Sequence, residues 1–355
     1  MKRLLLVTDA WKPQVNGVAR TMEEMRRYAL SQGVRVRVVH PGRFHTIPCP
    51  TEASLRLSTF PFRRLQTYFD RFQPDAVHLA TEGPLGLAAR RLCLHRRQPF
   101  TTSFCTHFPE YLHQRVGIPS DWTWRGVHWF HRPATTVFAA TPQLQQELEH
   151  RSFGKVALVS RGVDTEQFHP QAAQDLAMAN LPTNLPRPWF LSVGRIAQEK
   201  NLEAFLALNL PGSKLVVGDG PALPHLQQRY PHAHYLGTRS GAALAALYAA
   251  ADVFVFPSLT DTFGLVMLEA LASGTPVAAF PHQAPQAVLS GGRCAQMNVD
   301  LGKACLHALH MQPSACLRHA KKFTWERVGE LFLKNLDWGA GQGFFPRKPS
   351  PDHAA

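Results

Sequence analysis

Residues 252–281 read DVFVFPSLTDTFGLVMLEALASGTPVAAFP and contain a strand, a turn, a helix and a second strand in succession. The run 252–257 is short, β-branched and aromatic, which is typical of a buried strand. Residues 265–274 have helical composition, and 277–280 again favour a strand. This order predicts a βαβ unit, in which two parallel strands are joined by a helix that covers the sheet.

Short apolar runs alternate with helical segments along the whole chain, and they form one series in each half. This pattern predicts an α/β protein with two Rossmann-like, doubly wound parallel-sheet domains that face a central cleft. We expect an N-terminal domain over 1–169, a proline-rich linker over 170–187 and a C-terminal domain over 188–322. A C-terminal helix over 323–340 would pack back towards the first domain, and 341–355 would be a disordered tail. The predicted strands are Leu4–Thr8, Val34–Val39, Asp75–Ala80, Phe100–Thr106, Thr135–Ala140, Lys155–Ser160, Trp189–Val193, Lys214–Val217, Asp252–Pro257 and Val277–Phe280.

The composition excludes several classes of protein. With 45% hydrophobic and 18% charged residues over 355 positions, the chain is not intrinsically disordered. The N-terminus lacks the apolar run of a secretory signal, and no window is apolar enough to span a membrane. The six cysteines form no CxxC pair, so we expect reduced, structural thiols in a cytoplasmic protein.

The positive charge is concentrated in the first half of the chain. Of the net +13, residues 1–170 carry +10 (23 Lys and Arg against 13 Asp and Glu), and residues 171–355 carry +3 (15 against 12). Such an excess suits an anionic partner, either phospholipid headgroups or nucleic acid. Charge alone does not choose between the two.

One segment between 62 and 72 has two interpretations. Phe62, Leu65, Phe69 and Phe72 form an apolar stripe at helical spacing beside several arginines. This pattern suits a basic helix lying at a membrane interface. An ordinary helix packed on the sheet explains the stripe as well, and we prefer that interpretation.

The loops that leave the predicted strands are where ligands bind in doubly wound folds. The loop 258–264 ends in a glycine and opens the helix 265–274, so its free N–H groups suit a phosphate. Glu269 is the only charge on that helix. A buried carboxylate needs a partner, so we expect either a protein donor or ligand hydroxyls beside it.

Two further loops of the second half carry candidate ligand-binding residues. Arg195 and Lys200 follow the strand 189–193, where their two cations could neutralise a diphosphate. Gly218-Asp219-Gly220 follows the strand 214–217 and would let the backbone approach a ligand closely. It is equally compatible with a plain turn, and it does not form the GxGxxG pattern of a nicotinamide site.

In combination these motifs resemble the donor half of retaining GT-B glycosyltransferases of family 4. The resemblance rests on Arg195 and Lys200, on Gly218–Gly220 and on PSLTDTFGLVMLEALASGTPVAAFP at 257–281. The first half agrees, because DAWKPQVNGV (9–18), TEGPLG (81–86), THFPEY (106–111) and SRGVDTEQFHP (160–170) are similar to the bacterial GDP-mannose-dependent α-mannosyltransferase branch. The resemblance covers roughly residues 1–338.

The resemblance implies a role for each matching residue. Arg195 and Lys200 would hold the nucleotide diphosphate, together with Gly218 and the amides of the helix start at Phe263, Gly264 and Leu265. Glu269 would accept hydrogen bonds from the ribose hydroxyls, and Asp261 would contact hydroxyls of the transferred sugar. Asn16 and Gly17 would form a turn in the N-terminal domain that reaches the donor phosphates or the acceptor.

The sequence departs from the family pattern at two positions. The family's E-x7-E pair is Asp261 and Glu269 here, which keeps the charge and shortens the first side chain by one methylene. Many members carry a histidine beside the sugar at the position of Cys105. His107, two residues along, would lie on the same face of a continuing strand and is our candidate to replace it. A buried histidine without a catalytic role is the alternative.

The resemblance therefore implies a retaining hexosyltransferase that takes its sugar from a nucleotide diphosphate donor, first of all mannose from GDP-mannose. A UDP-glucose- or UDP-galactose-dependent enzyme is the alternative within the fold. A basic nucleic-acid- or membrane-binding protein without catalysis is the alternative from another class. We expect a lipid or glycan acceptor, an anionic membrane surface as partner, no nucleic acid, no separate cofactor and no metal, since no DxD motif occurs. The expected location is cytoplasmic, peripheral on the inner face of the cell membrane.

Overall fold

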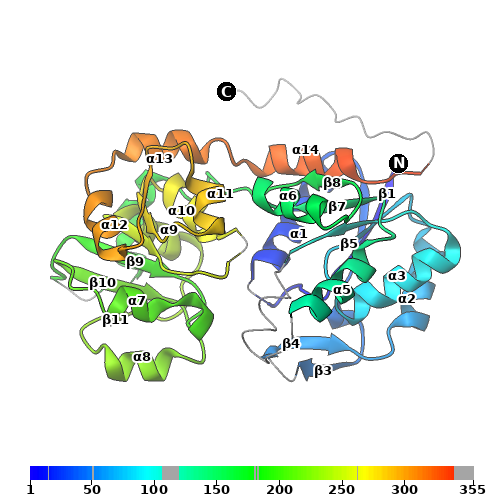
Figure 1. Cartoon of the computed structure of the whole chain (residues 1–355), viewed down its shortest axis with the longest axis horizontal. Helices are drawn as coiled ribbons and strands as arrows, with labels where there is room; N and C mark the ends of the chain where they lie inside the picture. Colours follow the sequence, from blue (N-terminus) through cyan, green and yellow to red (C-terminus); the bar gives the residue numbers. More distant parts are fainter. Residues whose placement is uncertain are drawn as a thin grey trace. The chain divides into compact units, whose positions relative to one another are not determined.

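The computed structural model describes residues 1–14, 16–49, 52–105, 120–179, 181, 184–261 and 263–339. The chain divides into two compact units (Figure 1). The first contains Met1–Ser160 together with Trp325–Ala355, and the second contains Arg161–Thr324. The sequence-based boundary at residue 169 therefore lies inside the second unit.

A parallel sheet forms the centre of the first unit. Its strand order is β2-β1-β5-β6-β7-β8, and every neighbouring pair is parallel. The order reverses direction between β1 and β5, because β2 lies on one side of β1 and the later strands lie on the other. The strands are β1 (Arg3–Val7), β2 (Arg35–Val39), β5 (Ala76–Leu79), β6 (Thr101–Ser103), β7 (Thr136–Ala139) and β8 (Val156–Leu158).

Helices cover both faces of this sheet because its strands β1, β5 and β7 are buried on both sides. On β5, Val77 and Leu79 point into a core formed with α2 (Phe62–Phe72), α3 (Pro84–Arg96) and α5 (Ser120–His131). The alternate residue His78 points the other way, where its ring lies 5.0 Å from that of Phe332 on α14 (Trp325–Asn335). The remaining helices are α1 (Gly17–Ser31), η1 (Pro41–Arg43) and α6 (Pro142–His150).

The stripe on α2 belongs to the core. Leu65, Phe69 and Phe72 are buried in the cluster with the sheet, and Phe62 packs against it. The interpretation of α2 as an ordinary packed helix is therefore confirmed. A two-stranded hairpin, β3 (Thr46–Cys49) with β4 (Glu52–Ser58), precedes this helix and was not predicted from the sequence.

The second unit repeats the architecture. Its sheet has the order β11-β10-β9-β12-β13-β14, again parallel, with the reversal between β9 and β12. One face packs against α7, α8 and α12, and the other against α9 and α10. The short strands β11 and β14 were missed by the sequence analysis. The elements are η2 (Pro170–Ala179), β9 (Trp189–Val193), η3 (Gln198–Lys200), α7 (Leu202–Leu206), β10 (Ser213–Val217), α8 (Leu223–Arg229), β11 (His234–Tyr235), α9 (Gly241–Ala250), β12 (Val253–Phe256), α10 (Leu265–Ala272), β13 (Val277–Ala279), α11 (Gln283–Leu289), β14 (Ala295–Met297), α12 (Leu301–Ala308) and α13 (Pro313–Ala320).

The segment expected as a linker is partly structured. Residues Pro170–Ala179 form η2, which packs along α9 and buries Ala172 and Ala179. The only proline in this segment, Pro170, is its first residue, a position at which a helix tolerates proline. The disordered tail expected over 341–355 lies outside the described residues.

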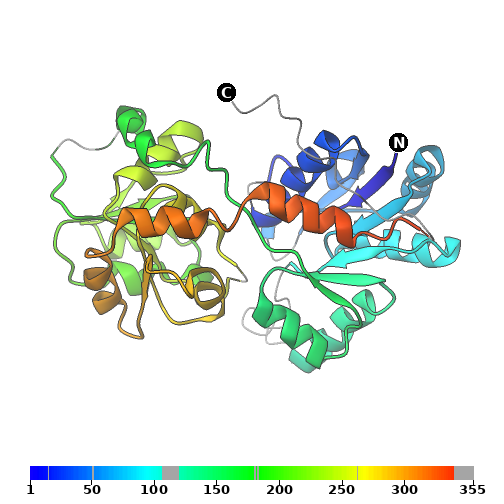
Figure 2. The ribbon, with the colours of Figure 1, turned by 90° about the horizontal axis from the view of Figure 1, so that it is seen from above.

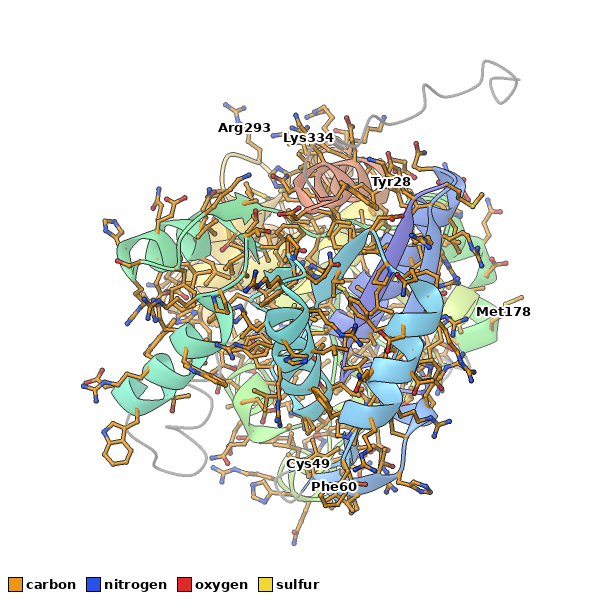
Figure 3. All side chains as sticks on the ribbon, turned by 90° about the vertical axis from the view of Figure 1, so that its right-hand side faces the viewer. Tyr28, Cys49, Phe60, Met178, Arg293 and Lys334 are labelled. Carbon is orange, nitrogen blue, oxygen red and sulfur yellow. The ribbon has the colours of Figure 1, made fainter. Side chains whose placement is uncertain are left out.

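The C-terminal helix α14 runs beside α1 in the first unit (Figure 2). Gly329 of α14 meets the ring of Tyr28, which lies next to α14 in Figure 3. A Cβ at Gly329 would lie 2.3 Å from Cγ of Tyr28. The close approach of the two helices therefore requires a glycine at this position.

Gly329→Ala should lower stability by about 1–3 kcal/mol, because the added methyl group overpacks the contact with Tyr28. Gly126→Ala in α5 is the matched control: its Cβ would meet no atom within 4 Å, so the better helix former should raise stability by up to about 1 kcal/mol. Urea denaturation of both variants measures the difference. Equal effects at both positions would contradict the proposed packing.

Candidate functional site

Three loops of the second unit meet at the carboxyl edge of its sheet. They follow β9, β10 and β12, which are neighbours in the order β10-β9-β12. Ligands of doubly wound folds bind at such an edge, where the strand order reverses. The reversal lies between β9 and β12, so the loops 194–201 and 257–264 flank it on either side.

Glycines allow the loops after β9 and β10 to touch through their backbones. A Cβ at Gly218 would lie 1.9 Å from the carbonyl oxygen of Gly194, and one at Gly220 would lie 2.3 Å from that of Ile196. The amide of Ile196 donates to the carbonyl of Asp219 at 2.8 Å. The two glycines of the GDG turn are thus required by loop packing, whatever further contact Gly218 makes with a ligand.

The two cations expected at a diphosphate are each held by a carboxylate. Arg195 pairs with Glu199 in its own loop. Lys200 donates to Oδ1 of Asp261 at 2.5 Å, which joins the loop after β9 to the loop after β12. Both side chains of this second pair keep partial exposure, 29% for Lys200 and 21% for Asp261. The structure therefore places Lys200 beside Asp261 directly at the strand reversal.

Asp261 has one oxygen that the described protein atoms do not satisfy. Its Oδ2 is buried and has no hydrogen-bond partner there. A buried, unpaired carboxylate oxygen costs free energy, so such an atom calls for an explanation. A hydroxyl group of a ligand bound at this edge would supply the missing donor.

The residues that hold these loops together were not predicted from the sequence. The carbonyl of Glu199 accepts from Thr260 Oγ1 at 3.1 Å and from Ser258 Oγ at 3.5 Å. The Asn201 side chain donates to the carbonyl of Pro257 at 3.1 Å. The signal for Glu199 was its spacing of four residues from Arg195, whereas nothing in the sequence pointed to the hydroxyl groups.

The helix α10 begins directly at the site. Gly264 is its N-cap with a φ of 78°, a left-handed conformation that favours glycine. A Cβ there would also lie 2.8 Å from Met267 Cε and 2.9 Å from the ring of Phe256. Phe263 is buried beside it. The first N–H groups of a helix lack intrahelical partners, so Leu265 opens a segment suited to an anion.

Glu269 has the protein partner that its burial demands. Its side chain, in a residue only 4% exposed, accepts a hydrogen bond from the hydroxyl of Tyr248 on α9 at 2.9 Å. Tyr248 is itself fully buried. Its role was not foreseen, because the two positions are 21 residues apart and only the packing of α9 on α10 brings them together.

In the first unit, the corresponding strand reversal lies between β1 and β5, and Asp9 lies there. Its carboxylate accepts from Leu85 N at 2.9 Å, Thr81 Oγ1 at 2.8 Å and Gly86 N at 3.3 Å. Burial raises the pKa of Asp9, and the hydrogen bonds from Leu85, Thr81 and Gly86 oppose that shift. Asp9 therefore anchors the start of α3 to the end of β1.

A second polar cluster lies next to Asp9. The fully buried ring of His131 lies 3.1 Å from Oε1 of Glu82 through Nε2, and 2.8 Å from Thr102 Oγ1 through Nδ1. Glu82 follows β5 and keeps a partly exposed side chain, 12%, at the carboxyl edge. In the sequence, Glu82 stands out only within the motif TEGPLG, and nothing there singles out His131.

Asn16 and Gly17 stand at the start of α1. The Asn16 side chain accepts from Ala19 N at 2.9 Å, so it is the N-cap of this helix. Its amide donates to Gln14 at 3.2 Å. The contact of this turn with a donor or acceptor stays a prediction, as do the roles of the residues named above. His107 lies outside the described residues, while Cys105 is buried just after β6.

The chain matches two family models, Glycosyltransferase Family 4 over residues 15–167 and Glycosyl transferases group 1 over 187–309. A GDP-mannose-dependent alpha-mannosyltransferase of Mycobacterium tuberculosis is 32% identical over 320 residues, which are 82% of this chain and 82% of that protein. The chain belongs to glycosyltransferase family 4.

Two other proteins show how widely this glycosyltransferase is related. An alpha-monoglucosyldiacylglycerol synthase of Streptococcus pneumoniae is 24% identical, with 94% of this chain and 84% of that protein covered. A sucrose-phosphate synthase structure from Thermosynechococcus elongatus superposes with a TM-score of 0.75 at 18% identity, covering 94% of this chain and 97% of that one. The resemblance to family 4 and the predicted GT-B fold of two parallel-sheet domains are thus confirmed.

Several general properties of the glycosyltransferase follow from the described residues. No helix among them is long and apolar enough to cross a membrane. They contain no group of three or more His, Cys, Asp or Glu side chains arranged for a metal ion. All six cysteines are free thiols. Burial raises the pKa of Cys93, Cys305 and Cys316 to about 12, so these thiols are poor nucleophiles.

Tyr248→Phe should destabilise the glycosyltransferase by about 1–3 kcal/mol, because it removes a donor from the buried Glu269 and keeps the ring. Tyr230→Phe is the matched control, since that hydroxyl donates to the exposed Glu203 at 3.3 Å and should contribute under about 0.5 kcal/mol. Urea denaturation compares them. Equal losses would mean that burial adds nothing to the pair of Tyr248 and Glu269.

Proposed function

We propose that this glycosyltransferase moves a hexose, with retention at the anomeric carbon, from a nucleotide diphosphate sugar to an acceptor hydroxyl. The observation that carries the proposal is the contact of Lys200 with Asp261 at the strand reversal of the second unit. In a nucleotide sugar, the hexose is bonded to the distal phosphate. A cation that binds this phosphate and a carboxylate that binds the sugar must therefore be neighbours. Lys200 and Asp261 meet this requirement.

The diphosphate would lie against Lys200, Arg195 and the start of α10. Lys200 acts as a point charge and Arg195 through its planar guanidinium, which Glu199 holds in place. The N–H groups near Gly264 and Leu265 would add the positive end of the helix dipole. These groups concentrate positive charge where the leaving diphosphate gains negative charge, which lowers the barrier to bond cleavage.

The sugar and the nucleoside would bind on either side of the diphosphate. Asp261 Oδ2, buried without a partner, would accept a hydrogen bond from a hexose hydroxyl. Glu269 accepts a hydrogen bond from Tyr248, and a carboxylate is a group that can accept hydrogen bonds from ribose hydroxyls. We propose that Asp261, one methylene shorter than the glutamate of the family pattern, tunes the choice of donor sugar.

The proposed chemistry is same-face attack by the acceptor hydroxyl, with the leaving phosphate accepting its proton. The bond from the anomeric carbon to the phosphate oxygen breaks while the bond to the acceptor oxygen forms. This route needs no covalent enzyme nucleophile. We propose that it needs no metal ion either, because Arg195, Lys200 and the α10 amides supply the positive charge.

GDP-mannose is the first proposed donor, on the strength of the 32% identity to a protein named as a GDP-mannose-dependent alpha-mannosyltransferase. UDP-glucose or UDP-galactose is the second candidate, since another relative is named as a glucosyldiacylglycerol synthase. That name also supports a lipid-linked acceptor. A basic binding protein without catalysis is not favoured, because the chain belongs to an enzyme family and holds paired charges at its ligand edge.

Thermal-shift titrations with GDP, UDP, ADP and inorganic phosphate, each with and without EDTA, test the donor site. A nucleotide that binds only the folded protein adds about 2.7 kcal/mol of stability at 100 times its Kd. We expect GDP to give the largest shift and EDTA to leave it unchanged. A larger shift with UDP selects the second donor, and no shift with any nucleotide contradicts the assignment. NMR of the transferred sugar's anomeric carbon then tests retention.

Lys200→Ala and Glu269→Ala should each reduce sugar transfer by on the order of 100-fold or more, since preorganised charges are worth a few kcal/mol in the transition state. Lys303→Ala and Glu203→Ala are charge-matched controls on exposed positions of the same unit and should keep near-normal transfer. Initial rates with GDP-mannose, on variants whose folded state is verified by circular dichroism, provide the measurement. Near-normal activity of both site variants would refute the proposed site.

A further inference from the structure

Two tryptophans on the outer side of the first unit are far more exposed than is usual for this residue. Trp122 is 71% exposed and Trp129 is 55% exposed. Both lie on α5, seven residues apart, which places them on the same side of the helix two turns apart. Large apolar side chains are normally buried, so a pair of exposed indoles on one face points to a contact with something outside the unit.

The residues of α5 around these indoles leave them accessible. Arg125 and Gly126 lie between the two tryptophans on the exposed side of the helix. A Cβ at Gly126 would meet no atom within 4 Å, so packing does not require the glycine. The inward residues Trp124, Val127 and Phe130 bury the opposite side against the core. The helix therefore has one face in the core and one aromatic face in solvent.

The neighbouring helix α3 extends this surface. Arg90 stacks on the ring of Trp129 at 3.8 Å and donates to the carbonyls of Trp129 and Phe130. The exposed side of α3 carries Leu87, 42% exposed, and Leu94, 46% exposed. Figure 3 views the first unit from the side on which α3 lies at the front. We define the α3–α5 surface as Leu87, Arg90, Arg91, Leu94, Trp122, Arg125 and Trp129.

The helices that form the α3–α5 surface carry a strong excess of positive charge. Residues 84–97 and 120–132 contain six arginines and a single acidic residue, Asp121. A membrane interface attracts this combination, because indole rings settle at the level of the lipid headgroups while guanidinium groups pair with phosphates. The arginine stacked on Trp129 brings both groups to the same point.

The position of α5 also suits a substrate that resides in a membrane. The last residue of α5, His131, contacts Glu82, so the α5 end that carries Trp129 lies near the edge where Asp9 and Glu82 lie. A lipid-linked acceptor held by its headgroup would need to rise only a short distance from the bilayer to this edge. The stripe of α2, by contrast, is buried in the core and offers no membrane contact.

We propose that the α3–α5 surface docks the enzyme on an anionic phospholipid bilayer, with Trp122 and Trp129 inserted at the headgroup level and the arginines bound to lipid phosphates. This inference deepens the proposed function, since a lipid-linked acceptor would be reached there. Binding to vesicles needs no donor sugar. Its outcome is therefore separate from that of the nucleotide titrations.

The test is co-sedimentation of the full chain with vesicles of phosphatidylcholine alone or with phosphatidylglycerol, supported by quenching of tryptophan fluorescence by brominated lipid. We expect binding only to the anionic vesicles, weakened by salt. Trp122→Ala/Trp129→Ala should weaken it by about tenfold or more, and Met178→Ala, an exposed apolar residue of the second unit, should not. Arg91→Glu/Arg125→Glu should weaken it by at least about tenfold.

Arg293→Glu/Arg318→Glu changes the net charge equally on exposed positions of the second unit and should keep binding within about twofold. If this control lost as much vesicle binding as Arg91→Glu/Arg125→Glu, net charge alone would explain the effect, which would overturn the proposal. So would absent vesicle binding, binding to nucleic acid in its place, or a change of oligomeric state as the only effect of the tryptophan variant. A melting temperature lowered as much as by a core substitution would show that the indoles are structural, which also overturns it.

Discussion

The hydrogen bond between Lys200 and Asp261 depends on a single topological constraint, the reversal of strand order between β9 and β12. Because β9 lies between β10 and β12, the loops that follow these strands emerge side by side. Nζ of Lys200 and Oδ1 of Asp261, which are 61 positions apart in the chain, thereby lie 2.5 Å apart. The other loop contacts at this carboxyl edge follow from this arrangement. The glycines bring the loop after β10 against the loop after β9, and the hydroxyls of Ser258 and Thr260 donate to the carbonyl of Glu199.

Burial gives the site its rigidity. Glu269 is held by Tyr248 in a region with almost no solvent, and the stacking of α9 on α10 fixes both. In the first unit, the carboxylate of Asp9 accepts three hydrogen bonds that fix the start of α3 beside the end of β1. Each unit thus has a carboxylate near its strand reversal that hydrogen bonds from the protein hold in position. Fixed dipoles and charges are what electrostatic stabilisation of a leaving group requires.

The membership in family 4 explains the second unit better than the first. The carboxyl edge of the second unit's sheet carries residues whose charge and placement suit a nucleotide sugar. The first unit adds the polar cluster of Glu82, His131 and Thr102 at its edge, and the aromatic and basic α3–α5 surface on its outside. Part of the positive charge of the first unit lies in residues 84–97 and 120–132, which contain six arginines and a single acidic residue, Asp121.

The sequence by itself determined the two parallel-sheet domains, because short apolar runs and helical periods are local signals that a single sequence contains. It also indicated the loops at Arg195, Lys200 and Gly264, and the need of Glu269 for a partner. The two-residue strand β11 and the hairpin β3–β4 carry too weak a pattern to be seen locally, and their pairing depends on distant neighbours. The identity of Glu269's partner, the contact of Lys200 with Asp261 and the burial of the α2 stripe were decided only by tertiary structure. Hydrogen bonds and packing contacts depend on which residues are close in space, and the order of residues along the chain does not specify this.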